Sequence, residues 1–342
     1  MAIPTSPANA PTPTGRTPKG DGKAASRQGA RSSRRFALLL LSPTFLVLAL
    51  VVGYPVLAGI RQSMYSPAEG LDDDGFVVEG EQFVGLDNYT ALFTGERGDA
   101  FWNAFFNTTF FTATAVVLET VIGVCLALIM HQALRGRGLV RASVLVPWAV
   151  PTAMSGLLWR WIFQPDGVAN AILHQEILWT ADGWQSKFAV IIAEVWKTSP
   201  FIGLLALAGL QMIPQDVYEA ARVDGAGPWQ QFRRITLPLI KPALAVAVLF
   251  RMLDTLRMFD LPFVLIGANK ESVETLSMLA WSEANNLRYG VATAYATLLF
   301  LYIAALAYAF IKIAGADVIG EARVRKATQK KSPQKAQKGA AS

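Results

Sequence analysis

The hydrophobic residues of this chain are gathered into long runs that are separated by shorter polar segments. A transmembrane helix needs about 20 mostly apolar residues, because the hydrocarbon core of a bilayer is about 30 Å thick and a helix rises about 1.5 Å per residue. Six runs are long enough, so the pattern predicts an all-α membrane protein with six transmembrane helices. We place them at residues 36–60, 104–130, 142–163, 188–210, 243–265 and 290–314.

The composition agrees with a membrane protein. Hydrophobic residues make up 53% of the chain, charged residues make up 16%, and the mean hydropathy is +0.35. Soluble domains contain about 25% charged residues. The first run is longer than the about 7–15 apolar residues of a signal peptide, so we expect it to be retained. One cysteine and two histidines exclude a disulfide framework or an iron–sulfur cluster and leave little for a metal site.

Positive charge is distributed unequally between the polar segments. If the N-terminus is cytoplasmic, the segments on that side contain 21 Lys and Arg residues, and the segments on the other side contain 5. The positive-inside rule then predicts that both termini are cytoplasmic. The net charge of +6 is explained by this topology and by contact with membrane lipid, and it does not indicate nucleic acid binding.

Three polar segments lie at the edges of the predicted spans. Residues 1–35 are rich in Pro, Ser, Gly and basic residues and predict a disordered basic cytoplasmic tail, and residues 315–342 predict a second basic cytoplasmic tail. Residues 61–103 contain nine acidic residues, including three in a row at 72–74. This segment predicts a solvated acidic external loop rather than a small folded cap.

The polar segment at residues 213–242 predicts two short helices. Residues 215–223 follow Pro214 with acidic residues early, as is typical of a helix start. Gly225 and Gly227 end this helix, and Pro228 is well placed to begin another. A short helix–glycine–helix element favours docking of another protein. The alternative is an interfacial helix that lies on lipid.

This segment resembles the EAA loop of ABC-importer permeases. The family pattern is EAA, three residues, Gly, about nine residues and I-x-L-P, and the chain matches it from Glu219 to Pro238. By this resemblance the loop holds the helix that seats in a groove of a cytoplasmic ATPase. The residues expected to couple to the ATPase are Glu219, Ala220, Ala221, Asp224, Gly225 and Pro238.

Residues 36–314 as a whole resemble the sugar-permease branch of this family, particularly its maltose- and trehalose-type subunits. Supporting segments lie at residues 83–89, 137–141 and 257–260, whereas residues 266–270 depart from the Thr-Gly-Gly-Gly-Pro of many relatives. The resemblance implies a type I ABC importer permease fold with its core at residues 104–314. It also implies a second permease subunit, two ATP-binding subunits, an extracellular solute-binding protein and a di- or oligosaccharide substrate such as trehalose or maltose.

The chain itself is not expected to be an enzyme or to bind a cofactor. Its nearest approach to a phosphate-binding loop, residues 15–20, is followed by Asp21 in place of the required Lys. ATP and Mg²⁺ are therefore expected on the partner subunits. An ion-coupled secondary transporter that uses Glu119, Glu194 or the acids of the fifth run is the alternative, although the inverted repeats typical of that class are not visible.

Ionisable residues inside the spans are candidates for function, because burying a charge in lipid is costly. Arg251, Asp254, Arg257 and Asp260 alternate in sign every three residues and would wind around about half of one helix. They predict either a structural ion-pair ladder or a polar translocation path. Glu194 is three residues from Lys197, and the two could simply pair.

Tryptophans in the spans add to the second interpretation, since sugars pack their C–H faces on aromatic rings. The alternative is that each Trp is an interfacial anchor. Pro147 and Pro151 are expected to loosen the third span, which is tolerated where a helix lines a cavity. The candidate residues for the substrate path are Trp148, Trp159, Glu194, Trp196, Asp254, Arg257 and Asp260.

Overall fold

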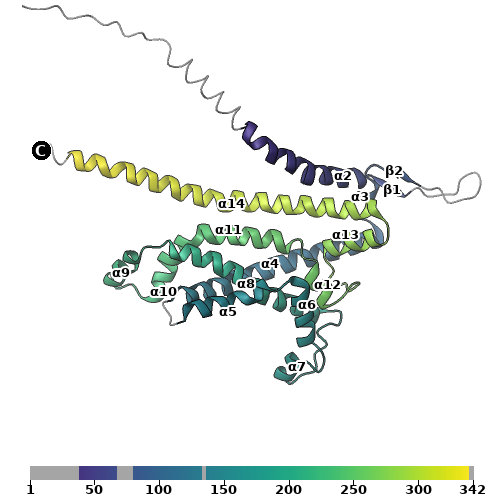
Figure 1. Cartoon of the computed structure of the whole chain (residues 1–342), viewed down its shortest axis with the longest axis horizontal. Helices are drawn as coiled ribbons and strands as arrows, with labels where there is room; N and C mark the ends of the chain where they lie inside the picture. Colours follow the sequence, from purple (N-terminus) through teal and green to yellow (C-terminus); the bar gives the residue numbers. More distant parts are fainter. Residues whose placement is uncertain (1–37, 68–79, 133–135, 339–342) are drawn as a thin grey trace, which may run out of the picture. The chain divides into compact units, whose positions relative to one another are not determined.

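The structure is a computed structural model, and it describes residues 38–67, 80–132 and 136–338. The predicted tail at residues 1–35 and the acidic run at residues 72–74 lie outside these ranges. The chain divides into two compact units between Ala58 and Gly59, which are described separately. Figure 1 shows that the described residues are almost entirely helical.

The described part of the first unit, residues 38–58, belongs to one apolar helix, Leu38–Gln62. It contains a π-helical stretch, η1 (Ala49–Gly53), and continues into α2 (Tyr54–Gln62). None of its residues up to Ala58 is buried. A helix that is apolar on all sides requires lipid or another membrane helix around it, which agrees with the first predicted span.

The second unit contains a two-stranded antiparallel sheet and the remaining helices. Their bounds are β1 (Tyr65–Pro67), β2 (Glu81–Phe83), α3 (Asp87–Ala91), α4 (Gly95–His131), α5 (Arg137–Ala149), α6 (Thr152–Ile162), α7 (Val168–Leu173), α8 (Trp184–Gln211), α9 (Gln215–Val223), α10 (Pro228–Gln231), η2 (Phe232–Thr236), α11 (Leu237–Thr255), α12 (Asp260–Leu265), α13 (Leu276–Asn285) and α14 (Tyr289–Lys338).

Helices α4, α8 and α11 pack side by side in this unit (Figure 1). Small residues allow the close approach: Gly123 of α4 lies against Ile202 and Gly203 of α8, where an added Cβ would be 2.8 Å from the Ile202 side chain. Among the described residues, five helices are long and apolar enough to cross a membrane, or six if the bent pair of α5 and α6 is one span.

The third predicted span is broken, not merely loosened. Helices α5 and α6 meet at an angle of 94°. Val150 is extended, with φ −74° and ψ 131°, because the ring of the following Pro151 disfavours a helical residue before it.

The fifth predicted span, residues 243–265, is wrong as a single helix. Helix α11 begins earlier and ends at Thr255, and α12 starts only at Asp260. Pro262 lacks an N–H and its ring would clash with the carbonyl of Met258 in a continuous helix. Arg257 and Asp260 therefore lie outside α11, so the four charges do not form one helical ladder.

The described part of the predicted external loop is a folded cap, which corrects the expectation of a solvated segment. Asn88 is buried in α3, and its Nδ2 donates to the carbonyls of Ser63 and Tyr65, each at 2.9 Å. Its Oδ1 accepts a hydrogen bond from Ser66 Oγ at 2.9 Å. The Asn88 side chain thus provides hydrogen-bond donors to two backbone carbonyls at the start of the hairpin. Leu92, which follows α3, is completely buried.

The last helix is also longer than predicted. Helix α14 continues past residue 314 to Lys338, through the segment that we predicted to be a tail. This segment is rich in Ala, Lys, Arg and Gln, which are strong helix formers.

Candidate functional site

The helix–glycine–helix element predicted at residues 213–242 is present. Helix α9 is followed by a turn at Asp224–Gly227, and then α10 and η2 lead into α11. Tyr218 Oη lies 3.0 Å from Thr236 Oγ1, and Gln231 Nε2 donates to the Ala226 carbonyl at 2.7 Å. These two bonds tie α9 to the end of η2 and the turn to α10.

Gly225 adopts the conformation for which glycine is best suited. Its φ is +77°, and its N–H donates to the Arg222 carbonyl at 3.1 Å. The next amide, Ala226 N–H, donates to the Ala221 carbonyl at 2.9 Å. Together they close the C-terminal end of α9, where a left-handed residue is the usual terminator.

The EAA residues are divided between two faces of α9. Ala221 is buried against the rest of the chain, whereas Glu219 and Ala220 are exposed. Val223 is 88% exposed, although it is apolar. The outward face of α9 therefore carries Glu219, Ala220 and Val223, and Ala221 is small because it packs inward.

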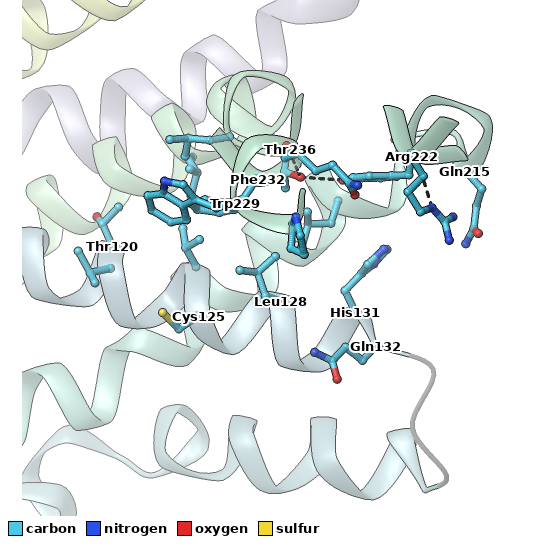
Figure 2. Close-up of a pocket in the computed structure, with 18 residues that line it drawn as sticks. Thr120, Cys125, Leu128, His131, Gln132, Gln215, Arg222, Trp229, Phe232 and Thr236 are labelled. Atoms are coloured by element: carbon cyan, nitrogen blue, oxygen red, sulfur yellow. Dashed lines mark hydrogen bonds between the residues drawn. The ribbon is translucent and has the colours of Figure 1, made fainter. Parts of the chain in front are cut away.

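A large cavity lies beneath this element. Its volume is about 1110 Å³, and it is bounded by the end of α4, by α9 and α10, and by η2 and the start of α11 (Figure 2). Tyr218 and Ala221 belong to the side of α9 that faces the chain, and Tyr218 lines this cavity. This helix–glycine–helix element thus lies over a cavity as well as over packed side chains.

Within the helices, Arg251 is the centre of a buried ionic cluster. Its Nε donates to Glu119 Oε2 at 2.7 Å, and its Nη2 donates to Glu194 Oε1 at 2.7 Å. Its Nη1 donates to Asp254 Oδ2 at 2.6 Å, and Thr198 Oγ1 donates to Glu119 Oε1 at 2.6 Å. The cluster joins α4, α8 and α11 through charge-assisted hydrogen bonds, which are stronger than neutral ones.

Glu194 therefore pairs with Arg251, and the described residues contain no ion pair between Glu194 and Lys197. The Glu194–Arg251 pair could not be predicted from the sequence, because Arg251 is 57 residues away and reaches Glu194 only across the contact between α8 and α11. Asp254 also lies 3.8 Å from Arg257 Nη2, and both of these side chains are more than 60% exposed.

Three of the predicted path residues meet in one cavity. Trp148, Asp254 and Arg257 line a volume of about 550 Å³ together with Arg251 and the rings of Phe201, Phe250 and Phe300. Trp148 lies 5.7 Å from Phe201, measured between ring centroids. Aromatic walls with a carboxylate and guanidinium groups suit a ligand that has both C–H faces and hydroxyls.

The other predicted path residues lie elsewhere. Trp159 and Trp196 are in edge-to-face contact at 5.6 Å and line a second cavity of about 610 Å³ between α4, α5, α6 and α8. Glu194 belongs to the ionic cluster, and Asp260 is exposed at the start of α12. The seven candidates therefore do not form a single site.

The segment at residues 266–270, where the chain departs from the Thr-Gly-Gly-Gly-Pro pattern, leads into a loop that is hydrogen-bonded to α4 and to the residues just before α8. Asn107 Nδ2 donates to the Glu271 carbonyl at 2.7 Å, and Ser272 N–H donates to Asp182 Oδ1 at 2.9 Å. Hydrogen bonding from Ser272 lowers the pKa of Asp182 below its ordinary value.

Comparisons with known proteins identify the family of this chain. Residues 119–319 match the family described as "binding-protein-dependent transport system inner membrane component". The chain is 38% identical to the trehalose/maltose transport system permease protein of Thermococcus litoralis over 82% of its own length and 93% of that protein. It is 36% identical to a trehalose transport system permease protein of Mycobacterium tuberculosis over 86% and 94% of the two chains.

A solved structure shows the same fold. A chain from a bacterial ABC transporter involved in the import of the acidic polysaccharide alginate superposes with a TM-score of 0.69 at 21% identity. The match covers 86% of this chain and 99% of that one.

Proposed function

The chain belongs to the family of inner membrane components of binding-protein-dependent transport systems, and from this premise we propose that it is the permease subunit of an ATP-driven sugar importer. It is a multi-pass protein of the cell membrane. The observation that carries the proposal is the similarity to trehalose and maltose permeases along more than four-fifths of the chain. The substrate that this supports is a di- or oligosaccharide such as trehalose or maltose.

In the proposed importer complex, each kind of subunit has a different role. A solute-binding protein delivers the sugar from outside, and a second permease subunit completes the path. Two ATP-binding subunits supply the energy, so that ATP and Mg²⁺ are held by them and not by this chain. The exposed face of α9, with Glu219, Ala220 and Val223, is the part that docks on an ATP-binding subunit.

The cavity at Trp148 is the part of the path that this subunit provides. Its aromatic rings pack against sugar C–H faces, while Asp254 and Arg257 exchange hydrogen bonds with hydroxyls. Arg251 holds Asp254 in place from the buried cluster, which fixes the carboxylate without a bound ligand. The Trp159 and Trp196 cavity has mostly apolar walls and is not assigned to the path.

Reconstitution tests the proposal. The complete complex in proteoliposomes should take up a labelled disaccharide only when ATP and the binding protein are both supplied, and the ATPase should co-purify with this chain. Uptake that is driven by an ion gradient without the ATPase would instead establish a secondary transporter.

The path is tested by substitution. Trp148→Ala, Asp254→Asn and Arg257→Gln should each reduce uptake by about 10-fold or more. The last two weaken hydrogen bonds to a charged group, which are worth about 1.5–3 kcal/mol each, and Trp148→Ala removes a ring that packs on the sugar C–H faces. Trp161→Ala is the matched control, because Trp161 is 72% exposed and lines neither cavity. Equal uptake by Trp148→Ala and Trp161→Ala would remove the cavity from the path.

A further inference from the structure

The 1110 Å³ cavity beneath α9 has no role in the proposed transport path. Its volume exceeds the about 300–1,000 Å³ of typical small-molecule sites, so it has room for a long ligand. It lies on the side of the chain that carries the proposed coupling element, the helix–glycine–helix segment of residues 213–242. It shares no lining residue with the Trp148 cavity.

The long polar side chains that Figure 2 labels gather at one end of this cavity, and the small hydroxyl of Thr120 lies at the other. Figure 2 shows His131, Gln132, Gln215 and Arg222 at one end, whereas Leu128, Cys125 and Trp229 lie further along. The cavity is therefore amphipathic along its length. An amphipathic cavity fits a ligand with a polar head and an apolar tail.

The depth of the cavity matches one leaflet of a bilayer. Its α4 wall runs from Thr120 to His131 at the end of a candidate membrane span, which corresponds to a rise of about 16 Å at 1.5 Å per residue. Half of the hydrocarbon core is about 15 Å thick. A lipid tail that enters beside His131 would thus reach about to Thr120.

The charge at the polar end selects the kind of head group. No Asp or Glu is among the described residues that line the cavity. Arg222 donates from Nε to the Tyr218 carbonyl of its own helix at 3.3 Å, and it forms no ion pair within the described part of the chain. Its guanidinium retains donors for an anion, and Gln132 and Gln215 supply neutral donors at the same end of the cavity (Figure 2).

We propose that this cavity binds one anionic phospholipid, with its phosphate at Arg222 and its acyl chain along the apolar wall of α4. A bound lipid would fill the hollow between α4 and the coupling element, and the lipid composition of the membrane would thereby set how firmly α9 is supported. This inference does not depend on the identity of the transported solute.

The reactivity of the single cysteine of the chain can report whether this cavity is occupied. Cys125 lines the cavity and is exposed to it. The complete chain would be reconstituted in vesicles of phosphatidylcholine alone or of an equal mixture with phosphatidylglycerol. Alkylation of Cys125 by a membrane-permeant maleimide is then followed by intact-mass spectrometry. We expect Cys125 to react about fivefold more slowly in the vesicles that contain phosphatidylglycerol.

Two variants and one control locate the effect. Arg222→Gln should abolish the difference between the two vesicles, because it removes the charge that selects the head group. Val121→Trp should also abolish it, because the new ring fills the apolar part of the cavity, which Val121 lines. Arg234→Gln should leave the difference intact, since Arg234 is exposed nearby but does not line the cavity.

Three outcomes would overturn the proposal. Equal alkylation of the unmodified chain in the two vesicles would exclude selection of an anionic lipid. An equal effect of Arg234→Gln and Arg222→Gln would show only general surface attraction. In a further reconstitution with the second permease subunit, equal protection of Cys125 in both kinds of vesicle would identify the cavity as a contact between subunits.

Discussion

At Gly225 the backbone has a φ of +77°, and an added Cβ would meet no atom within 4 Å. A substitution there is therefore strained by the backbone alone, at a cost of about 1–2 kcal/mol for most side chains. We predict that Gly225→Val lowers sugar uptake severely, because the turn that orients α9 can no longer close. Uptake is to be measured beside the amount of protein in the membrane.

Two further substitutions separate strain from size at this turn. Gly225→Asn should restore much of the uptake, since Asn tolerates the left-handed region. Gly227→Ala should be neutral, because Gly227 has a φ of −68° and open space around it. Normal transport by Gly225→Val at normal abundance would contradict the coupling role of this turn.

Arg251 offers a second prediction at the scale of one residue. Arg251→Met would leave Glu119 and Glu194 buried without their cation, and breaking such a buried pair costs about 3–5 kcal/mol. We expect a clear fall in the thermal unfolding midpoint of the detergent-solubilised chain. Arg257→Met is the control, because that side chain is 66% exposed and an exposed pair is worth only about 0–1 kcal/mol. Equal midpoints for the two variants would show that the cluster does not hold the helices together.

At the scale of elements, the hairpin of β1 and β2 meets the first turn of α14. An added Cβ at Gly290 would lie 1.8 Å from the Tyr65 carbonyl oxygen and 2.9 Å from Asn88 Nδ2. Since the Tyr65 carbonyl belongs to the backbone, the hairpin or the helix must move. We predict that Gly290→Ala destabilises the chain by about 1–3 kcal/mol, as overpacking does.

The same melting experiment contains its own comparison. Gly138→Ala changes a glycine near the start of α5 whose added Cβ would meet nothing within 4 Å. It should leave the midpoint unchanged or raise it, because Ala favours a helix. Equal thermal unfolding midpoints for the Gly290→Ala and Gly138→Ala chains would mean that the cap is not packed on α14.

At the scale of the whole molecule, the unequal distribution of Lys and Arg predicts which face is cytoplasmic. In a Cys125→Ser background, Glu176→Cys should react with an impermeant thiol reagent applied to intact cells. Gln230→Cys should react only after the membrane is opened, since it lies in the coupling element. Both positions are exposed, so that a lack of reaction reports sidedness and not burial. Labelling of Gln230→Cys from outside would reverse the topology.

The sequence by itself determined the membrane class, most of the spans and the helix–glycine–helix element at residues 213–242. Each of these depends on residues that are neighbours along the chain: an unbroken apolar run, or the order of Glu219, Gly225 and Pro238. The positive φ of Gly225 follows from the same local pattern, because the end of a short helix requires it. Such features are encoded within one continuous segment and can be predicted without contacts.

The tertiary structure alone decided which distant side chains meet. Glu194 could have paired with Lys197 on its own helix, but the contact between α8 and α11 brings Arg251 within 2.7 Å. Likewise, Trp148 shares a cavity with Asp254 while Trp159 and Trp196 line another, and Ala221 packs inward while Val223 faces out. These outcomes depend on the rotation of each helix about its axis and on the breaks at Pro151 and Pro262. The breaks follow from the local effect of each proline ring. The rotations are set by packing between segments far apart in the chain, where hydrophobic periodicity carries no information about the partner.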